Sequence, residues 1–315
     1  MISFQDYYNE KDSGLLYSIF IGAIIVASFL LGFIANIFGL TNNVFLQWFN
    51  QAGLYILLFL VVWFYLRLNK INVVKANGLN VKFKFTDYLV FIMIGAGMFL
   101  ALLIVNYFYA YFLQEVGHTQ SAGIDVNSTA TFIAGIFIIC MLPAVVEETV
   151  FRGAVLKGYS NIFSSGAAIV ISAVLFMLMH MNIEQFVNAF ICGVILAVLS
   201  KKTGSTIPGM VVHFINNFLA ILISFIASFS GEVSDGKITL DNDAITSLLI
   251  YMVIGLALLT GGYMIIRSRF RKQEKPETDF NASYNENVGR LSKSTAILYA
   301  LIGIIAAVLF TILIW

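Results

Sequence analysis

The sequence predicts an all-α polytopic transmembrane bundle of eight or nine helices, and three observations support this prediction. The chain has 315 residues, of which 60% are hydrophobic and 11% charged, and its mean hydropathy is +0.90. A soluble domain of this length carries far more charge. Apolar runs of about 17 to 25 residues, the length needed to cross a bilayer, recur nine times. Basic and acidic residues also alternate between the connecting loops.

The nine runs are expected to form three parts. Residues 1–128 would hold three N-terminal helices, residues 129–230 a core of four helices, and residues 231–315 two C-terminal helices. The predicted spans are, in chain order, 15–38, 53–68, 88–113, 131–156, 165–180, 183–200, 208–228, 247–266 and 295–315.

Features at the ends of the runs support this assignment. The first run follows an acidic tail and is too long for the apolar part of a signal peptide, so we expect no cleavage there. The fifth and sixth runs are separated only by residues 181–183, which predicts a helical hairpin that turns inside the membrane. Irregular backbone at that depth needs protein or a wet cavity around it. We therefore expect a water-filled cavity, open to the cytoplasm, with His180 at its floor. The last run ends at Trp315, an interfacial aromatic.

The charges in the loops predict an orientation. Basic residues gather in the second, fourth, sixth and eighth loops, whereas the intervening loops hold acidic residues. Because cytoplasmic loops carry the excess of Lys and Arg, we expect an integral, multi-pass membrane protein with a cytoplasmic N-terminus. The basic residues that carry this argument are Arg67, Lys70, Lys75, Lys82, Lys84, Lys157, Lys201, Lys202, Arg267, Arg269, Arg271, Lys272 and Lys275.

Two adjacent glutamates stand in the fourth run, although an ionised carboxylate is costly inside lipid. Glu148 and Arg152 are four residues apart and can pair on one helix face, whereas Glu147 is rotated by about 100° from Glu148. An unpaired carboxylate in a low-dielectric site holds a proton more tightly, which suits a general base. The alternative is a salt-bridged helix end at the cytoplasmic surface.

Further polar residues lie in other apolar runs. His213 and Asn217 are four residues apart and share a face, where two neutral donors can stabilise an oxyanion. His180 ends a run that has no other polar side chain after Ser172. Each residue alone is better explained by helix packing or a helix–helix hydrogen bond. Together with the glutamates, they favour one shared polar site.

Taken together, these motifs resemble those of a known family. Glu147-Glu148-x-x-x-Arg152, Phe176-x-x-x-His180 and His213-x-x-x-Asn217 are similar to the three-motif signature of the CPBP (CAAX protease and bacteriocin-processing, or Abi) family of intramembrane proteases, and in particular to type II CAAX prenyl endopeptidases. The resemblance covers about residues 130–230.

The resemblance implies a hydrolase that cleaves a membrane-associated, prenylated or leader peptide. Glu147, helped by His180, would activate a water molecule. His213 and Asn217 would stabilise the oxyanion, and Glu148 with Arg152 would support the site.

Two alternatives of a different kind remain. A Glu with two His also resembles a zinc site, but there is no HExxH motif, and a metal-free site without a cofactor is favoured. The protein could instead be a transporter, or a non-catalytic bacteriocin-immunity or regulatory protein of the same fold. The expected partners are a peptide or protein substrate and the lipid bilayer, and no nucleic acid.

Overall fold

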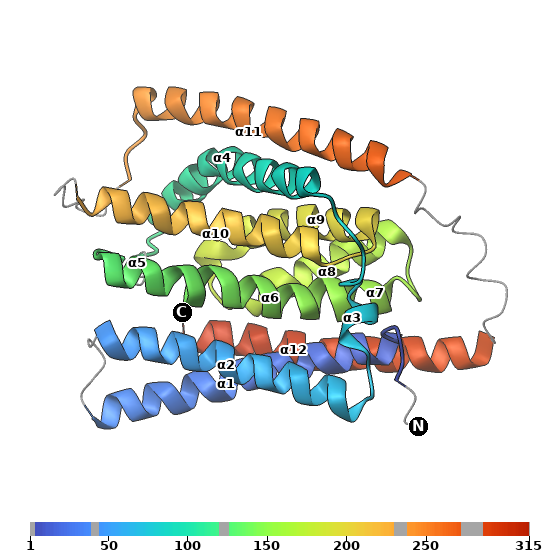
Figure 1. Ribbon diagram of the computed structural model, residues 1–315. Coiled ribbons are helices and arrows are strands. Elements are labelled where there is room, and N and C mark those ends of the chain that lie inside the picture. The colour runs from blue at the N-terminus through green and yellow to red at the C-terminus, as the bar shows by residue number, and fades with distance from the viewer. Residues whose placement is uncertain (1–3, 39–43, 120–125, 230–237, 272–285, 315) are drawn as a thin grey trace.

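The computed structural model describes residues 4–38, 44–119, 126–229, 238–271 and 286–314, which form a bundle of long helices (Figure 1). The predicted all-α transmembrane bundle is confirmed. The α-helices are α1 (Glu10–Ile37), α2 (Val44–Leu68), α3 (Val73–Ala76), α4 (Phe85–Glu115), α5 (Thr129–Gly135), α6 (Leu142–Glu148), α7 (Leu156–Tyr159), α8 (Ser165–Met179), α9 (Phe186–Thr203), α10 (Ile207–Ala227), α11 (Asn242–Arg269) and α12 (Glu286–Ile314). Two π-helices, η1 (Ile136–Met141) and η2 (Thr149–Val155), join α5, α6 and α7 into one rod, and a 3₁₀ turn, η3 (Ile183–Gln185), precedes α9.

Eight helical segments among the described residues are long and apolar enough to cross a membrane, and α8 is the apolar helix that falls short. Its 15 residues reach about 22 Å, less than the hydrocarbon thickness of about 30 Å. The chain turns at Met181, which has a positive φ of 46°, and Asn182 caps η3. The hairpin of α8 and α9 begins and ends at the same end of the bundle (Figure 1), with its turn where the sequence has the break at residues 181–183.

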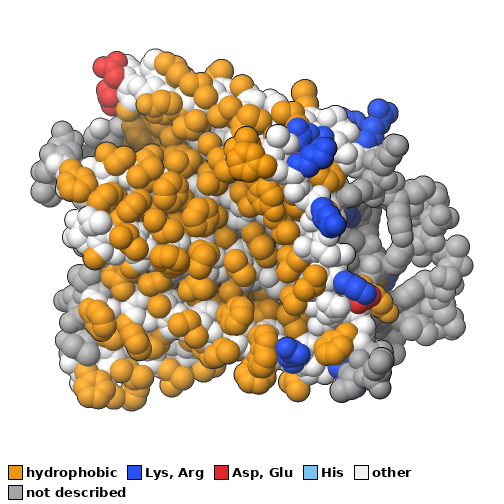
Figure 2. Space-filling model, in the orientation of Figure 1, with side chains coloured by type: hydrophobic (Ala, Val, Ile, Leu, Met, Phe, Trp, Pro, Cys, Tyr) orange, Lys and Arg blue, Asp and Glu red, His pale blue; other side chains and the backbone are white. Residues whose placement is uncertain are grey.

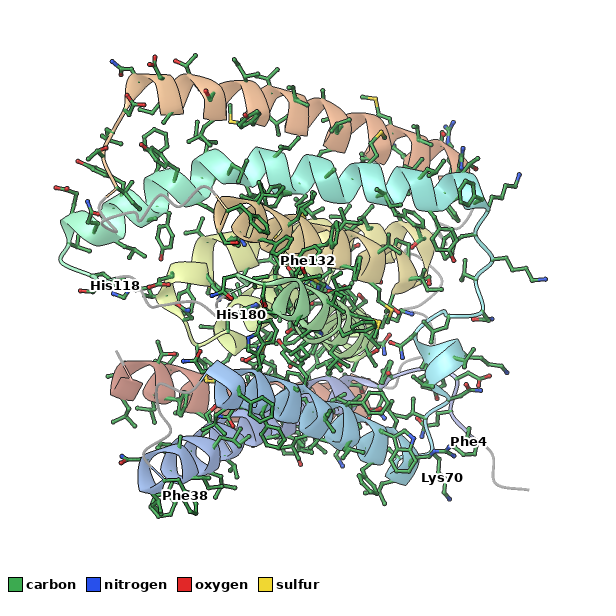
Figure 3. All side chains as sticks on the ribbon, turned by 60° about the vertical axis from the view of Figure 1, so that its left-hand side comes forward. Phe4, Phe38, Lys70, His118, Phe132 and His180 are labelled. Carbon is green, nitrogen blue, oxygen red and sulfur yellow. The ribbon has the colours of Figure 1, made fainter. Side chains whose placement is uncertain are left out.

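The turn of this hairpin lies beside the C-terminal part of α4. The Tyr109 hydroxyl donates to the carbonyl oxygen of Ile183 at 2.8 Å. His118, just beyond α4, places Nε2 at 3.0 Å from Oε1 of Glu184. Figure 3 labels His118 at the edge of the molecule and His180 in its interior. These contacts fix the position of His180 along the bundle.

The helices form three layers (Figure 1). The rod of α5 to α7 lies with α8, α9 and α10 in the middle layer, α4 and α11 cover one side, and α1, α2 and α12 cover the other. Small residues permit the close crossing of α4 and α11: a Cβ added at Gly255 would lie 2.4 Å from the backbone nitrogen of Ala101. Close contact between small residues is a main source of helix association in lipid. The middle layer is therefore enclosed on both sides by apolar helices.

Charged side chains mark the ends of the bundle. Figure 2 shows a broad apolar surface with Lys and Arg gathered toward one end. At that end Lys75 pairs with Asp6 at 2.8 Å, and Arg269 pairs with Asp87. Helix α1 begins at this end and α12 terminates at the opposite one (Figure 1).

Pro143 explains the first π-helix. Proline has no backbone N–H, so the carbonyl of Ile139, four residues earlier, loses its α-helical donor. The N–H of Leu142 correspondingly bonds to the carbonyl of Phe137, five residues back. A π-turn inserts one extra residue into a helix and is frequent at functional sites. The irregular rod carries Glu147 and Glu148 directly after this distortion.

Candidate active site

The two glutamates lie in the interior of the bundle. Glu147 is 2% exposed, and both Glu148 and Arg152 are fully buried. Arg152 donates from Nη1 to Oε1 of Glu148 at 2.8 Å and from Nη2 to the carbonyl of Gly193 at 3.3 Å. The predicted pairing of Glu148 with Arg152 therefore exists, but within the protein core rather than at a helix end in water.

His213, from α10, lies between the two carboxylates. Its Nδ1 lies 3.2 Å from Oε1 of Glu148. Its Nε2 lies 3.9 Å from Oε2 of Glu147, which is too far for a direct hydrogen bond. Oε2 of Glu147 is buried and has no hydrogen-bond partner among the described residues. A single water molecule bonded to both Oε2 and Nε2 would satisfy this oxygen.

The approach of α10 to Glu148 depends on a glycine. A Cβ added at Gly209 would lie 2.5 Å from Oε2 of Glu148. Gly209 stands one helical turn before His213 on α10. The missing side chain lets α10 approach closely enough for His213 to contact Glu148 and to lie 3.9 Å from Glu147.

Tyr55, from α2, is a site residue that the sequence analysis missed. Its hydroxyl donates to Oε1 of Glu147 at 2.7 Å. Oε1 is thereby held in place while Oε2 faces His213. Tyr55 lies in an ordinary apolar run, and its sequence position carries no signal that would single it out from the other 13 tyrosines of the chain.

Phe176 brings the second motif into the site. The guanidinium carbon of Arg152 lies 4.2 Å from the centre of the Phe176 ring. The same ring contacts His180 edge-on at 4.9 Å and His213 at 6.0 Å between centroids. Residues from all three motifs therefore surround one aromatic side chain.

His180 caps the C-terminus of α8. Its Nδ1 lies 2.9 Å from the carbonyl oxygen of Phe176. A carbonyl oxygen only accepts, so Nδ1 carries a hydrogen and, in the neutral ring, Nε2 is the acceptor. The hydrogen bond thus selects the tautomer in which Nε2 can take a proton.

The side chain of Asn217 is hydrogen-bonded to the distorted rod. Its Nδ2 donates to the carbonyl of Ile139 at 3.1 Å, and its Oδ1 accepts from Nδ2 of Asn216 at 3.3 Å. The Ile139 carbonyl is the one that Pro143 leaves without its helical donor. Asn217 therefore stabilises the rod, as a helix–helix hydrogen bond would, and its amide retains one further hydrogen.

Metal ligation requires a third side chain. Oε2 of Glu147 and Nε2 of His213 are close enough to bind one ion, but a zinc site needs at least three protein ligands. No group of three His, Cys, Asp or Glu side chains in the described part of the chain has a metal-binding arrangement. Cys140 and Cys192 are buried and form no disulfide.

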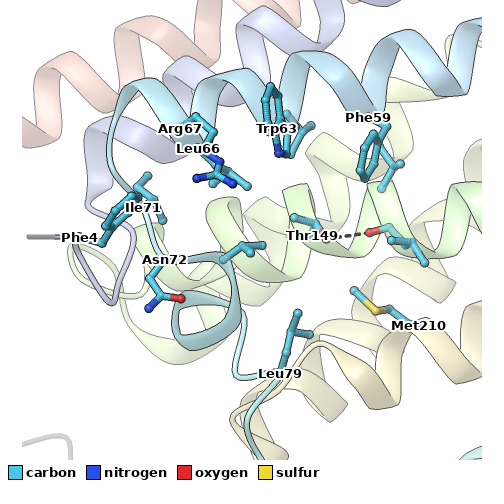
Figure 4. Close-up of a pocket in the computed structure, with 14 residues that line it drawn as sticks. Phe4, Phe59, Trp63, Leu66, Arg67, Ile71, Asn72, Leu79, Thr149 and Met210 are labelled. Atoms are coloured by element: carbon cyan, nitrogen blue, oxygen red, sulfur yellow. Dashed lines mark hydrogen bonds between the residues drawn. The ribbon is translucent and has the colours of Figure 1, made fainter. Parts of the chain in front are cut away.

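A pocket of about 520 Å³ is lined by neighbours of the glutamates in the rod, although neither Glu147 nor Glu148 lines it (Figure 4). Helix α2 forms one wall, Val145, Val146 and Thr149 of the rod form another, and Met210 of α10 lies opposite α2. His180 is not among the lining residues. This pocket therefore differs from the expected cavity with His180 at its floor.

The comparisons with known proteins concern the middle of the chain. Residues 129–219 match the family model described as type II CAAX prenyl endopeptidase Rce1-like. This segment runs from the start of α5 into α10 and contains Glu147, Glu148, Arg152, His180, His213 and Asn217. No curated protein and no solved structure matched the chain.

The match confirms the resemblance seen in the sequence. It indicates a protease of the CAAX type, in general terms, with a peptide or protein substrate at the membrane. Helices α1 to α4, and with them Tyr55, lie outside the matched segment.

Proposed function

With a CAAX-type protease domain as the premise, we propose that this protein is an intramembrane endopeptidase in which Glu147 activates a water molecule. One observation carries the proposal: Oε2 of Glu147 is buried, unpartnered among the described residues, and 3.9 Å from Nε2 of His213. A general base must lie within hydrogen-bond reach of the proton that it removes. A water molecule between these two atoms satisfies that requirement.

In the proposed reaction, Glu147 takes a proton from this water as the oxygen attacks the scissile carbonyl. The tetrahedral intermediate then collapses, and the same proton passes to the leaving nitrogen, so that one peptide bond and one water molecule become a carboxylic acid and an amine. Tyr55 holds Oε1 and keeps Oε2 directed at the water. His180, whose Nε2 is the accepting nitrogen, is proposed to assist the proton transfer.

His213 and Asn217 are proposed to stabilise the oxyanion. Glu148 accepts from both Arg152 and Nδ1 of His213, which holds the His213 ring with Nε2 on the side of Glu147, where Nε2 would donate to the oxyanion when it carries a hydrogen. Asn217 stands one turn along the same face, and its bond to the carbonyl of Ile139 fixes the direction of its remaining hydrogen. Two fixed donors on one face are what a developing oxyanion needs.

The membrane peptidome of cells with wild-type protein and with Glu147→Ala tests this proposal. We expect peptides that disappear only when Glu147 is present, which also names the substrate. A non-catalytic immunity or regulatory protein would keep its phenotype in the variant, and that outcome would refute the proposed hydrolysis. The Lys82→Gln variant, altered in an exposed loop residue, serves as the expression control.

A further inference from the structure

The pocket beside α2 has no part in the proposed peptidase reaction. Its inner wall is apolar and includes the buried residues Val62, Leu66 and Val146. Its rim includes Phe59 and Trp63, which are 49% and 41% exposed. Both rim residues belong to a helix that is long and apolar enough to cross a membrane, so their exposed sides contact lipid in a bilayer. The pocket is therefore an apolar groove that opens toward the lipid.

One end of the pocket reaches the segment that follows α2. Residues 71–73 of this segment line the pocket, together with Arg67 in the last turn of α2. Lys70 lies between them in the sequence and is exposed. This segment belongs to the end of the bundle where Lys and Arg gather (Figure 2). The pocket thus extends from the apolar part of α2 to the level at which lipid headgroups meet a membrane protein.

Arg67 has no acidic partner. It is the charged residue among the 14 that line the pocket (Figure 4). Its guanidinium carbon lies 5.5 Å from the centre of the Trp63 ring. It forms no ion pair with a carboxylate of the described residues, whereas Lys75 pairs with Asp6. Stacking on an aromatic ring leaves the N–H donors at the edge of the guanidinium free, and these donors suit two oxygens of a phosphate.

The chemistry of the pocket favours a phospholipid over simpler ligands. The volume of about 520 Å³ lies within the range of about 300–1,000 Å³ usual for ligand sites. A soluble anion such as inorganic phosphate would pair with Arg67 and leave the apolar wall empty, whereas a hydrocarbon alone would leave Arg67 unpaired. Neither Asp nor Glu is among the lining residues that the structure describes, so a cationic headgroup such as choline finds no partner. Basic pockets between transmembrane helices bind anionic headgroups.

We propose that this pocket binds one anionic phospholipid, with an acyl chain against the apolar wall and the phosphate on Arg67. This binding site goes beyond the proposed peptidase and does not depend on it. The bound chain lies between α2 and the rod, and it therefore also supports the packing that brings Tyr55 to Glu147.

The fluorescence of Trp63 tests this assignment. With Trp48→Phe and Trp315→Phe, Trp63 is the remaining tryptophan of the chain, and brominated acyl chains quench it on contact. The variant is reconstituted in mixtures of phosphatidylglycerol and phosphatidylcholine in which one lipid at a time is brominated. We expect an affinity at Trp63 about tenfold higher for phosphatidylglycerol, which corresponds to about 1.4 kcal/mol. Equal affinities would overturn the proposal, and they are the result expected if a peptide or no ligand occupies the pocket.

Substitutions separate Arg67 from a general attraction of anionic lipid to a basic surface. Arg67→Gln should bring the ratio of the two affinities to about one. Arg67→Lys, which keeps the charge but not the planar fork, should keep part of the preference. Lys82→Gln removes an exposed cation that does not line the pocket, and it should retain the wild-type ratio. Equal losses in Arg67→Gln and Lys82→Gln would refute a specific site.

A soluble headgroup distinguishes the lipid from a free phosphate. An excess of sn-glycerol 3-phosphate should leave the quenching of Trp63 unchanged, because it lacks the acyl chain. If it displaces the brominated phosphatidylglycerol, Arg67 binds a free phosphate and the lipid assignment is wrong.

Thermal unfolding provides a second measurement that keeps all three tryptophans of the chain. In detergent, phosphatidylglycerol should raise the Tm of the wild type more than phosphatidylcholine does, since a ligand stabilises the state that binds it. The two lipids should raise the Tm of Arg67→Gln equally. Equal rises in the wild type would refute the site. Neither measurement involves turnover, so the lipid site and the peptidase function stand or fall separately.

Discussion

The hydroxyl of Tyr55 donates a 2.7 Å hydrogen bond to Glu147 and so connects α2 to the proposed catalytic carboxylate. Tyr55→Phe removes this bond and almost nothing else. Because Tyr55 fixes the carboxylate rather than the substrate, we expect kcat to fall about tenfold with KM unchanged, as a hydrogen bond to a charged group of about 1.5 kcal/mol implies. Steady-state kinetics on a cleaved membrane peptide measures both constants.

Helix α2 supplies the matched control for this prediction. Tyr65 also donates to a carboxylate at 2.7 Å, but its partner is Asp12 of α1, away from the site. Tyr65→Phe should therefore leave kcat intact. Equal kinetic effects of the two substitutions would contradict the role of Tyr55.

Substitution of Glu147 should lower activity, whereas substitution of Glu148 should lower stability. Glu147→Gln removes the base, and we expect cleavage to fall by about 10²–10⁴-fold with a near-normal Tm. Glu148→Gln leaves Arg152 buried without its counterion, and breaking a buried pair in this way costs about 3–5 kcal/mol. Thermal unfolding in detergent, with turnover of the same samples, measures both effects. A large fall in Tm for Glu147→Gln would assign it a structural role instead.

Pro143 and Asn217 should be coupled in stability. Asn217→Ala leaves the carbonyl of Ile139 without a donor, and we expect a cost of about 1–3 kcal/mol. Pro143→Ala restores a backbone N–H that can bond to that carbonyl, so the double variant should lose less stability than the two single variants together. A double-mutant cycle from denaturant unfolding gives the coupling energy.

Activity of the same double variant tests the oxyanion role. If stability recovers while cleavage stays low, Asn217 acts on the substrate as well as on the rod. Full recovery of both would leave Asn217 with its structural role alone.

Gly209→Ala should disturb the site through contact with Glu148. The added Cβ would lie 2.5 Å from Oε2 of Glu148, and this carboxylate has little room to move because its other oxygen, Oε1, is held by Arg152 and His213. We expect a loss of about 1–3 kcal/mol from overpacking and a reduced kcat, because His213 is displaced. Gly22→Ala is the control, since a Cβ there meets no atom within 4 Å. The free energy of unfolding and the kcat of both variants test this prediction.

Chelation distinguishes the metal-free mechanism from a zinc mechanism. The described residues provide two candidate ligands, Glu147 and His213, where zinc needs three. We therefore expect prolonged dialysis against EDTA or 1,10-phenanthroline to leave cleavage unchanged. Activity that is lost on dialysis and restored by added zinc would assign Glu147 as a metal ligand.

The sequence was sufficient to predict the bundle, the pairing of Glu148 with Arg152 and the helical hairpin whose first helix ends at His180. These features follow from hydropathy, from four-residue spacing and from the break at 181–183, all of which are local properties of the chain. The contact of Tyr55 with Glu147 and the pocket near Arg67 depend on how α2 packs against the rod. No local sequence pattern predicts how α2 packs against the rod. An apolar helix in lipid carries apolar side chains on every face, so its sequence does not show which face contacts protein.

The effect of Pro143 on the structure depends on a residue that is distant in the sequence. The proline predicts an unsatisfied carbonyl at Ile139, but nothing near it in sequence says which group will satisfy that carbonyl. The donor is Asn217, 78 residues further on. An oxyanion role and a helix–helix hydrogen bond were the two alternatives for Asn217, and the structure shows the hydrogen bond.

The two π-helices have a practical consequence for mutagenesis of the rod. Each adds a residue to its turn, so an ideal helical wheel drawn through residues 129–159 is out of phase beyond Met141 by about one position, or roughly 100°. Alanine scans planned on such a wheel would take lipid-facing residues for interior ones. For the same reason, deleting one residue within Ile136–Met141 would remove the extra residue of that turn and keep both glutamates directed at His213, whereas a deletion in a regular α-helix rotates the residues that follow by about 100°.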